Sequence, residues 1–185
     1  MANNDVCSHK MAGFFDSKIR KIFQNPEKIV GPYIDKGMKV LDLGCGPGFF
    51  TIAMAKLVGS NGEVVGADLQ KEMLSKVKSK IQGTDLEDII QLHNTKKDSI
   101  GLSKKFDFIL VFYMLHEVPN QNKTLKELYD LLNDQGKILI VEPKGHVSKK
   151  DFEKSIELMK QYFNVFIGSK VFYSHSVILE KKEFS

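Results

Sequence analysis

Three glycines within five residues follow a short apolar run in the stretch "VLDLGCGPGFF" at positions 40–50. Gly44 and Gly46 can take backbone angles closed to other residues, so a phosphate, a nucleoside or an amino-acid group could approach the main chain there. A plain tight turn is the alternative. Asp42, two residues before the first glycine, narrows the choice. A carboxylate beneath the turn repels a pyrophosphate and stabilises a ligand that carries ammonium and sulfonium groups.

A second acid, Asp68, ends the next strand-like run, in "VVGADLQ". At that place an acid can accept hydrogen bonds from both ribose hydroxyls of a nucleoside lying over the first loop. Leu69 follows directly, where an apolar side chain can pack on a purine face. Each acid also has a simpler explanation, since Asp42 could be a solvent-bridged turn residue and Asp68 a helix N-cap. The whole set, in register on alternating strands, favours the nucleoside site.

These segments resemble a known family. "VLDLGCGPGFFT" and "VVGADLQKEML" are similar to the cofactor-binding half of the class I methyltransferases that use S-adenosylmethionine, in the style of the ubiquinone/menaquinone-biosynthesis type. The resemblance extends from about Pro26 to Lys181. It implies S-adenosylmethionine as the cofactor, S-adenosylhomocysteine as the product and a small molecule as the methyl acceptor.

The resemblance also implies a role for each matching residue. Asp42 would hold the amino group of the cofactor, indirectly or through water, while Asp68 would bind the ribose and Leu69 would pack on the adenine. The methionine part would be lined by Gly44, Cys45, Gly46 and Gly48.

Three further positions complete the implied cofactor site. Phe112, which closes the fourth strand-like run, would approach the methionine end through its backbone. Asn94 and Thr95 stand where such enzymes often place an acid and a small residue beside the adenine amino group. Because this sequence reads "HNT" there, the anionic contact is missing, and Asp98 is the candidate to replace it.

The acceptor side begins after the fourth run, at "FYMLHEVPNQ". Methyl transfer from a sulfonium is an in-line displacement, so the protein must chiefly align the reactants, and a general base is needed only for a protonated acceptor. Tyr113 and His116 lie at the pocket edge by position, and His116 is the preferred base, with a structural histidine as the alternative. The stretch lacks the (Asn/Asp)-Pro-Pro-(Tyr/Phe) motif, which counts against nucleobase amino groups and glutamine amides as acceptors.

The remaining polar residues near the predicted site give weaker signals of a role than Tyr113 and His116. Glu142 and His146, in "VEPKGHVS", emerge at the same edge, where they would be acceptor-site residues or ordinary loop residues. Cys7, His9, His116 and His146 show no zinc-ligand spacing, so no metal is expected. Cys45 fits a small loop residue better than a reactive thiol, and His175 fits a strand residue better than a ligand.

Strand-like and helix-like segments alternate along the chain and position these residues. Nearly continuous apolar runs at 38–43, 63–67, 88–93, 106–112 and 137–142 fit parallel strands covered on both faces. Amphipathic patterns at 47–59, 70–83 and 122–136, and one that opens at Ser148, predict the helices between them. Two strands around Gly168–Lys170 should pair antiparallel.

The predicted fold class is therefore α/β: a Rossmann-like, doubly wound, mostly parallel sheet with a C-terminal antiparallel hairpin strand. Its ligand should lie beyond the carboxyl ends of the strands, where the strand order reverses. Residues 1–185 are expected to form a single domain, with a helical segment at 1–35 and the Rossmann-like core at 36–185. The apolar residues of the first segment could form a lid over the site or a helix packed on the sheet.

Composition limits the remaining functions. The formal net charge of +4 is mild and its lysines alternate with acids, which is typical of a solvated surface and not of a nucleic-acid groove. No run is apolar enough for a membrane span or a secretory signal, so a cytoplasmic location is expected. The two cysteines, Cys7 and Cys45, form no spacing motif, so no disulfide is expected. The oligomeric state has no signal in the sequence.

Two alternatives to a methyltransferase stay open. A non-catalytic module that binds S-adenosylmethionine and regulates a partner would keep the glycine loop and need no acceptor pocket. An NAD-dependent oxidoreductase fits the alternation and Asp68, but Asp42 and the spacing G-x-G-x-G, in place of G-x-G-x-x-G, disfavour it.

Overall fold

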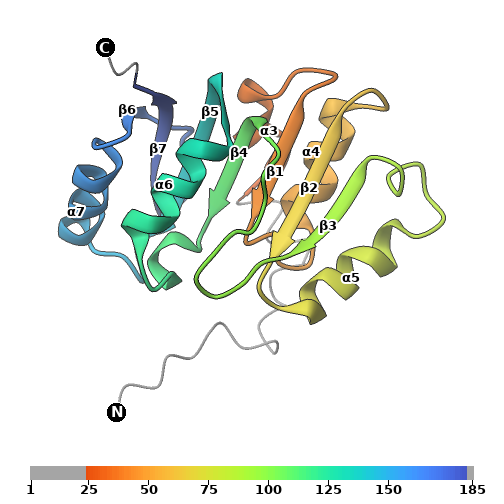
Figure 1. The fold of residues 1–185 in the computed structure, drawn as a ribbon, viewed down its shortest axis with the longest axis horizontal. Coiled ribbons are helices and arrows are strands. Elements are labelled where there is room, and N and C mark those ends of the chain that lie inside the picture. Colours follow the sequence, from red (N-terminus) through yellow and green to blue (C-terminus); the bar gives the residue numbers. More distant parts are fainter. Residues whose placement is uncertain (1–23, 183–185) are drawn as a thin grey trace.

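The computed structural model of the chain describes residues 24–182 and shows one seven-stranded sheet (Figure 1). The strands lie side by side in the order β3-β2-β1-β4-β5-β7-β6. Their bounds are β1 Lys39–Leu43, β2 Glu63–Asp68, β3 Ile90–Asn94, β4 Phe106–Phe112, β5 Leu132–Pro143, β6 Phe163–Ile167 and β7 Ser174–Lys181. The order reverses between β1 and β4, so the ligand edge predicted from the sequence lies at the ends of these two strands.

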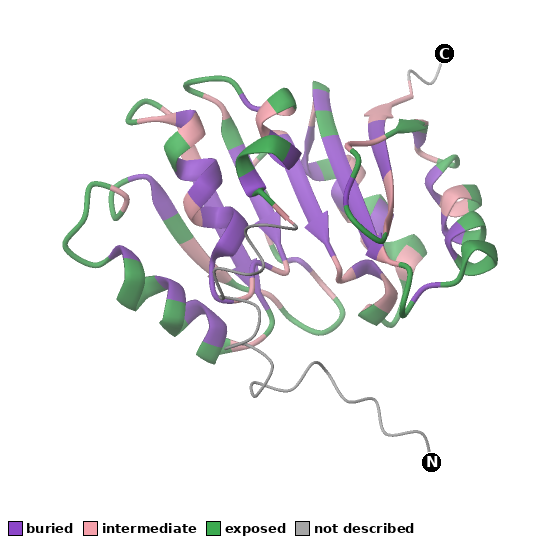
Figure 2. Cartoon of the chain, turned by 180° about the vertical axis from the view of Figure 1, so that it is seen from behind, coloured by how far each residue is buried: buried purple, intermediate pink, exposed green. Residues whose placement is uncertain are grey.

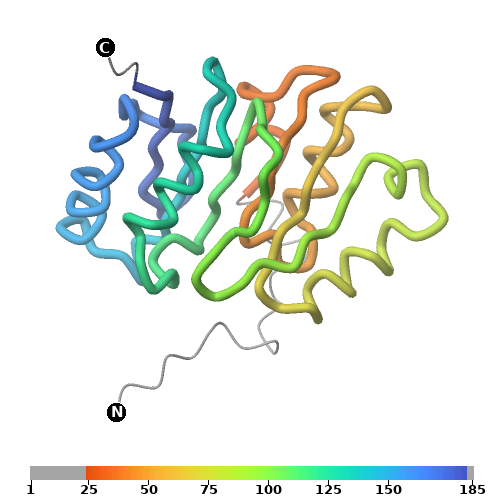
Figure 3. Tube along the Cα trace, in the orientation of Figure 1, coloured from red at the N-terminus to blue at the C-terminus, as the bar shows by residue number. Residues whose placement is uncertain are grey.

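The direction of the strands follows the prediction. β1 to β5 pair in parallel, whereas β7 pairs antiparallel with both β5 and β6. The Cα trace in Figure 3 shows β7 returning between β5 and β6. The predicted Rossmann-like fold class, including the antiparallel hairpin strand, is confirmed.

Helices cover both faces of the sheet. α3 (Pro26–Val30), α4 (Phe49–Val58) and α5 (Lys71–Ile81) pack with one set of strand side chains, and α6 (Gln121–Leu131) and α7 (Lys149–Met159) with the other. Two short 3₁₀ turns, η2 (Gly31–Tyr33) and η3 (Leu115–Glu117), precede β1 and α6. Because both faces are covered, the central strands are buried along nearly their whole length (Figure 2).

Several predicted helix ends are confirmed by their caps. The Asn25 side chain accepts a hydrogen bond from the Lys28 N–H at the start of α3, and the Ser148 side chain accepts one from the Asp151 N–H at the start of α7. α4 ends at Gly59, which has a φ of 69°. Each cap satisfies a backbone group that the helix itself leaves unpaired.

The predicted end of the helix at 122–136 is wrong. α6 ends at Leu131, and Leu132 already pairs with Phe106 as the first residue of β5. The leucine pattern misled the prediction because Leu132 is fully buried either way, in a helix or in a strand. The pairing of β4 with β5 then shifts between Phe106 and Phe108, which accommodates the residues up to Gly136.

The first predicted segment, 1–35, is described only from residue 24 onward. The apolar residues that could form either a lid or a packed helix, Phe14, Phe15, Ile19 and Phe23, lie outside the described residues. In the described part, α3 is a packed helix. Ile29 and Val30 are buried, and the Ser169 hydroxyl donates to the Ile29 carbonyl at 2.8 Å. Within residues 24–182, none of the helices combines the length and the apolar character needed to cross a membrane.

Candidate active site

The glycine loop after β1 is tied to the end of β2. The N–H groups of Gly44 and Cys45 both donate to the Ala67 carbonyl, at 2.8 and 3.0 Å. The loop then closes on itself, since the Gly48 N–H donates to the Cys45 carbonyl at 3.1 Å. Gly44, Gly46 and Gly48 have positive φ angles of 76°, 51° and 87°. The predicted loop therefore needs glycine at these positions, because a side chain is strained in that region.

Gly44 also has close neighbours. A Cβ atom added there would lie 2.9 Å from Cγ of Met114, which follows β4. The backbone of the loop thus packs directly against the first residues after the fourth strand. This contact joins the predicted cofactor side of the site to the predicted acceptor side.

We expect Gly44→Ala to lower both the melting temperature and the affinity for S-adenosylmethionine. The left-handed backbone costs about 1–2 kcal/mol with a side chain, and the contact with Met114 adds to that. Gly37→Ala is the matched control, because Gly37 has a φ of 84° but nothing within 4 Å of an added Cβ. Thermal unfolding and calorimetry of both variants test this. Equal losses of stability in the two variants would contradict the role of the Met114 contact.

Asp42 lies beneath the loop, on the α4 side of β1. Leu41 and Leu43 pack on the opposite face, as the alternation of a strand requires. The Asp42 side chain is only 2% exposed, and its Oδ2 accepts a hydrogen bond from the Thr51 hydroxyl at 2.6 Å. Thr51 was not predicted, although its position in the first turns of the following helix could have indicated it. The hydrogen bond holds a carboxylate in place under the loop.

The pKa of the Cys45 thiol reflects the negative charge around the loop. Burial, the Asp42 carboxylate and the Asp68 carboxylate, in that order, raise the pKa of its thiol far above the ordinary value. The thiol stays protonated at neutral pH, which agrees with the prediction of a small loop residue. The two acids therefore give this loop a negative potential.

Asp68 binds the glycine loop from the end of β2. Its Oδ2 accepts from the Gly46 N–H and its Oδ1 from the Gln70 N–H, both at 2.8 Å. Burial raises the pKa of the carboxyl group, and these backbone hydrogen bonds oppose that rise. The helix N-cap suggested for Asp68 is not formed, since Gln70 is the N-cap of α5, and the Asp68 carboxylate instead supports the Gln70 N–H and the loop. Each oxygen can accept a further hydrogen bond.

The residues after β3 gather around the same strand end. Asn94 Nδ2 donates to the carbonyls of Asp68 and Leu69, both at 3.0 Å, and the Thr95 N–H donates to the Asp68 carbonyl at 3.1 Å. Leu69 is 41% exposed, unlike most large apolar side chains here. The structure thus brings the predicted pair after β3 together with the predicted ribose and adenine residues.

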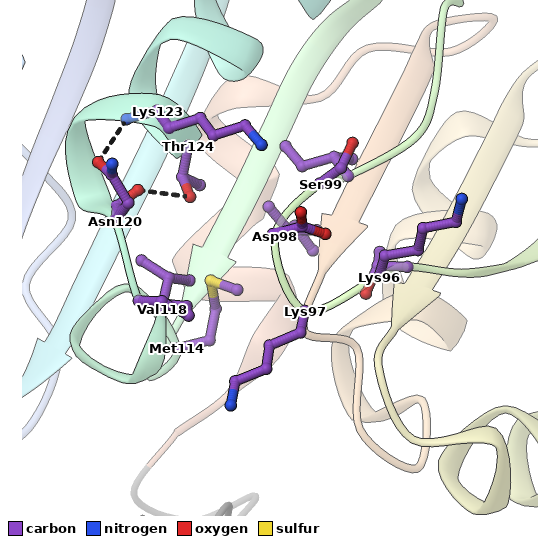
Figure 4. Close-up of a pocket in the computed structure, with 13 residues that line it drawn as sticks. Lys96, Lys97, Asp98, Ser99, Met114, Val118, Asn120, Lys123 and Thr124 are labelled. Atoms are coloured by element: carbon purple, nitrogen blue, oxygen red, sulfur yellow. Dashed lines mark hydrogen bonds between the residues drawn. The ribbon is translucent and has the colours of Figure 1, made fainter.

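A hollow of about 470 Å³, open to solvent, adjoins this group (Figure 4). Residues 95–100 line it, as do Leu43, Met114, Val118, Pro119, Asn120, Lys123 and Thr124. Asp98, the candidate to replace the missing acid, lines the hollow together with Met114 (Figure 4), and Thr95 lines it as well. Its place next to the ends of β1, β3 and β4 is the edge predicted for the ligand.

The residues that close β4 have unusual geometry. The Phe112 ring is buried and packs against the rings of Phe50 and Tyr113, with centroids 4.4 and 4.2 Å away. Tyr113 has a φ of 59°, a left-handed conformation that costs a non-glycine residue roughly 1–3 kcal/mol. Such strain clusters at functional sites. The surrounding contacts must hold it in place.

Two residues that were not predicted bind the Tyr113 hydroxyl. Gln24 Nε2 donates to it at 2.8 Å, and Ser174 Oγ lies 2.6 Å away. They come from the two ends of the described chain, and nothing in the local sequence pairs them. Tyr113 therefore joins Gln24, which precedes the N-cap of α3, to the start of β7 at the predicted acceptor side of the site.

His116 lies in η3 and is hydrogen-bonded through Nδ1 to the Glu142 carboxylate at the end of β5. The other oxygen of Glu142 accepts from the Leu115 N–H at 3.0 Å, and the side chain is 3% exposed. The hydrogen bond to Glu142 raises the pKa of His116 above its ordinary value, although burial opposes this. Glu142 belongs to a strand end that the sequence marked, but its pairing with His116 was not predicted.

His146 and His175 have different surroundings. His146 follows β5, with its ring centroid 6.0 Å from that of His116. His175 stacks on Phe152 and its Nε2 lies 3.2 Å from the Val147 carbonyl, as expected for a strand residue. Cys7 and His9, which were considered as metal ligands, lie outside the described residues.

A sequence model of one protein family, described as "Methyltransferase domain", matches residues 34–183. The chain belongs to this family. The match confirms the methyltransferase family predicted from the glycine loop and Asp68.

Curated relatives of this chain carry the name demethylmenaquinone methyltransferase. The protein from Lactobacillus johnsonii is 35% identical over 144 residues, which cover 75% of this chain and 58% of the relative. The protein from Geobacillus sp. is 33% identical over 109 residues, 59% of this chain and 47% of the relative. The chain thus spans about half the length of the curated relatives it matches.

Solved structures share the fold of this chain. A S-adenosylmethionine-dependent methyltransferase from Aquifex aeolicus superposes with a TM-score of 0.81 at 24% identity, covering 93% of this chain and 97% of that one. A putative methyltransferase of this type from Methanococcus maripaludis gives 0.78 at 17% identity, covering 96% and 93%. At such identities the likeness shows the fold alone.

Proposed function

We propose that the chain catalyses methyl transfer from S-adenosylmethionine to a small-molecule acceptor. One observation carries the proposal: Asp68 reaches across from β2 to the Gly46 N–H of the loop, while Asp42 is held beneath that loop. When S-adenosylmethionine lies on this loop, its ribose is next to the Asp68 carboxylate. Its ammonium and sulfonium groups lie in the negative potential of the two acids. The membership of the family supports the same reaction.

The predicted cofactor residues fall into three groups in this proposal. Asp68 binds the ribose hydroxyls, and Asp42 acts on the amino group through the loop. The methionine part lies along Gly44, Cys45, Gly46 and Gly48, next to the backbone of Phe112. The adenine packs on Leu69 beside Asn94 and Thr95, toward the hollow that Asp98 lines.

Asn94 takes over the contact with the adenine amino group that an acid makes in similar enzymes. Its amide donates to the carbonyls of Asp68 and Leu69, which a carboxylate could not do. The amide oxygen is an acceptor and suits the exocyclic amino group of adenine. An asparagine thus combines support of the strand end with recognition of the base.

The loop charge argues against a dinucleotide. Asp42 is buried beneath the loop and raises the pKa of Cys45, so its carboxylate would repel a pyrophosphate placed on the loop. The sulfonium and ammonium groups of S-adenosylmethionine would be stabilised there. This favours the methyltransferase over an NAD-dependent oxidoreductase.

We further propose an apolar acceptor of the hydroxyaromatic kind, such as a reduced quinone. The names of the curated relatives point to this class. Phe172 and Tyr173 are 66% and 64% exposed, and they directly precede Ser174, which binds the Tyr113 hydroxyl. Exposed aromatic side chains beside the acceptor side of the site suit an apolar acceptor.

The proposal is tested by isothermal calorimetry with S-adenosylmethionine, S-adenosylhomocysteine and NAD, followed by a methylation assay. Demethylmenaquinone reduced with dithionite is the first acceptor, and mass spectrometry detects the added methyl group. We expect binding of the first two ligands and not of NAD. Binding of S-adenosylmethionine without release of S-adenosylhomocysteine on any acceptor of a broad panel would favour the non-catalytic module instead.

A further inference from the structure

We propose that Glu142 is a positioning residue that fixes His116 as the proton acceptor for a methyl acceptor whose attacking atom carries a proton. The inference rests on the proposed methyltransferase function. It assigns a role to a buried carboxylate that the cofactor site does not use. It also limits the acceptor to groups such as a phenol or a quinol, which must lose a proton as they are methylated.

The hydrogen bonds of Glu142 determine which nitrogen of His116 is protonated. The carboxylate is 3% exposed, and its Oε1 is engaged by the Leu115 N–H at 3.0 Å. Its Oε2 faces His116 Nδ1, and an ionised carboxylate can only accept a hydrogen bond. The proton of the neutral ring must therefore be on Nδ1. Nε2 then has a free electron pair and can accept a proton.

Of the three groups around the ring, the two glutamates favour a strong base. Glu142 lies at the end of β5, Glu117 in η3 with Oε1 4.0 Å from Nε2, and His146 in the loop after β5. Asp68 at the end of β2 acts on Glu117 in turn. The two glutamates stabilise the imidazolium that forms when Nε2 takes a proton. The His116 side chain is 25% exposed, so a small acceptor can reach it.

The step balances in atoms and charge. Nε2 takes the hydroxyl proton of the acceptor while the oxygen, or a ring carbon that the oxygen activates, forms its bond to the methyl carbon. After attack by carbon, the ring C–H proton moves to the oxygen and the aromatic ring is restored. The bond between methyl and sulfur breaks, and its electron pair stays on sulfur in the neutral thioether product. His116 leaves the step as imidazolium beside the Glu142 carboxylate and returns the proton to solvent.

Glu142→Gln tests the role with little change in shape. The Leu115 N–H still requires an acceptor, so the amide oxygen takes the place of Oε1 and the NH₂ group faces His116. Nδ1 must then accept, and the proton of the neutral ring moves to Nε2. We expect kcat with reduced demethylmenaquinone to fall by about 10²–10⁴-fold, the usual contribution of general base catalysis, with the dissociation constant for S-adenosylmethionine unchanged.

The pH profile gives a readout that a structural role would not move. Because Glu142 raises the pKa of His116, loss of its charge lowers that pKa. A base works in its neutral form, above its pKa. The acidic limb of the residual rate in Glu142→Gln should therefore move to lower pH. Glu117→Gln is the matched control: it removes one charge from the same group, leaves Nδ1 bonded to Glu142 and should lose far less kcat.

The tautomer itself is observable by ¹⁵N NMR of the imidazole ring, in the wild-type protein and without any acceptor. We expect a protonated Nδ1 in the wild type and a protonated Nε2 in Glu142→Gln at high pH. A wild-type ring protonated on Nε2, or an unchanged kcat in a folded Glu142→Gln, would overturn the inference. Absence of turnover in the wild type, with the expected tautomer and bound S-adenosylmethionine, would instead contradict the proposed acceptor.

Discussion

Asp68→Ala should weaken the binding of S-adenosylmethionine by about 10²–10⁴-fold. The proposed site gives the ribose two charge-assisted hydrogen bonds, each worth ~1.5–3 kcal/mol, and every ~1.4 kcal/mol is a tenfold change in affinity. The carboxylate stands within hydrogen-bond reach of the loop that would carry the nucleoside, since its Oδ2 lies 2.8 Å from the Gly46 nitrogen. Calorimetry with S-adenosylmethionine and S-adenosylhomocysteine measures the change.

The structure adds a second consequence of this substitution. Asp68→Ala also leaves the N–H groups of Gly46 and Gln70 without their carboxylate acceptor, so the loop itself loses support. Asp68→Asn separates the two effects, because its amide oxygen still accepts from one of these groups while the charge is lost. Asp85→Ala, which removes an exposed acid, is the control. Wild-type affinity in a folded Asp68→Ala would refute the ribose role.

His116→Ala should lower kcat by about 10²–10⁴-fold while the affinity for S-adenosylmethionine is retained, because a general base acts on the acceptor and not on the cofactor. The assay is single-turnover methylation of reduced demethylmenaquinone, with cofactor binding measured separately. His146→Ala is a suitable control, since its exposed side chain lies near His116 but holds no proposed role. Full activity of His116→Ala would remove this residue from the catalytic list.

The sequence predicted those parts of the molecule that depend on local patterns. The apolar runs predicted the five parallel strands, and the glycines at 44, 46 and 48 predicted the loop, because each has the positive φ angle that glycine permits. The end of α6 was wrong because Leu132 suits a buried position in either a helix or a strand. A periodicity argument cannot separate these cases at a boundary.

The contacts that were missed join distant parts of the chain. Asp42 was marked from its position, but its partner Thr51 depends on how α4 packs on β1. The pairing of His116 with Glu142 spans 26 residues, and that of Tyr113 with Ser174 spans 61. Such pairs form only when the strands are placed side by side. The candidate site could therefore be located from the sequence, but its hydrogen-bond network could not.

The position of β7 between β5 and β6 has a consequence for biosynthesis. β6 is made before β7, yet its backbone hydrogen bonds in the sheet are all to β7. As the chain leaves the ribosome, β6 cannot join the sheet until β7 has emerged. Until then the edge of β5 that carries Ile138 and Ile140 is also uncovered. An open strand edge invites pairing with other chains. Nascent copies of this protein are thus most exposed to misassembly in the interval before β7 has emerged.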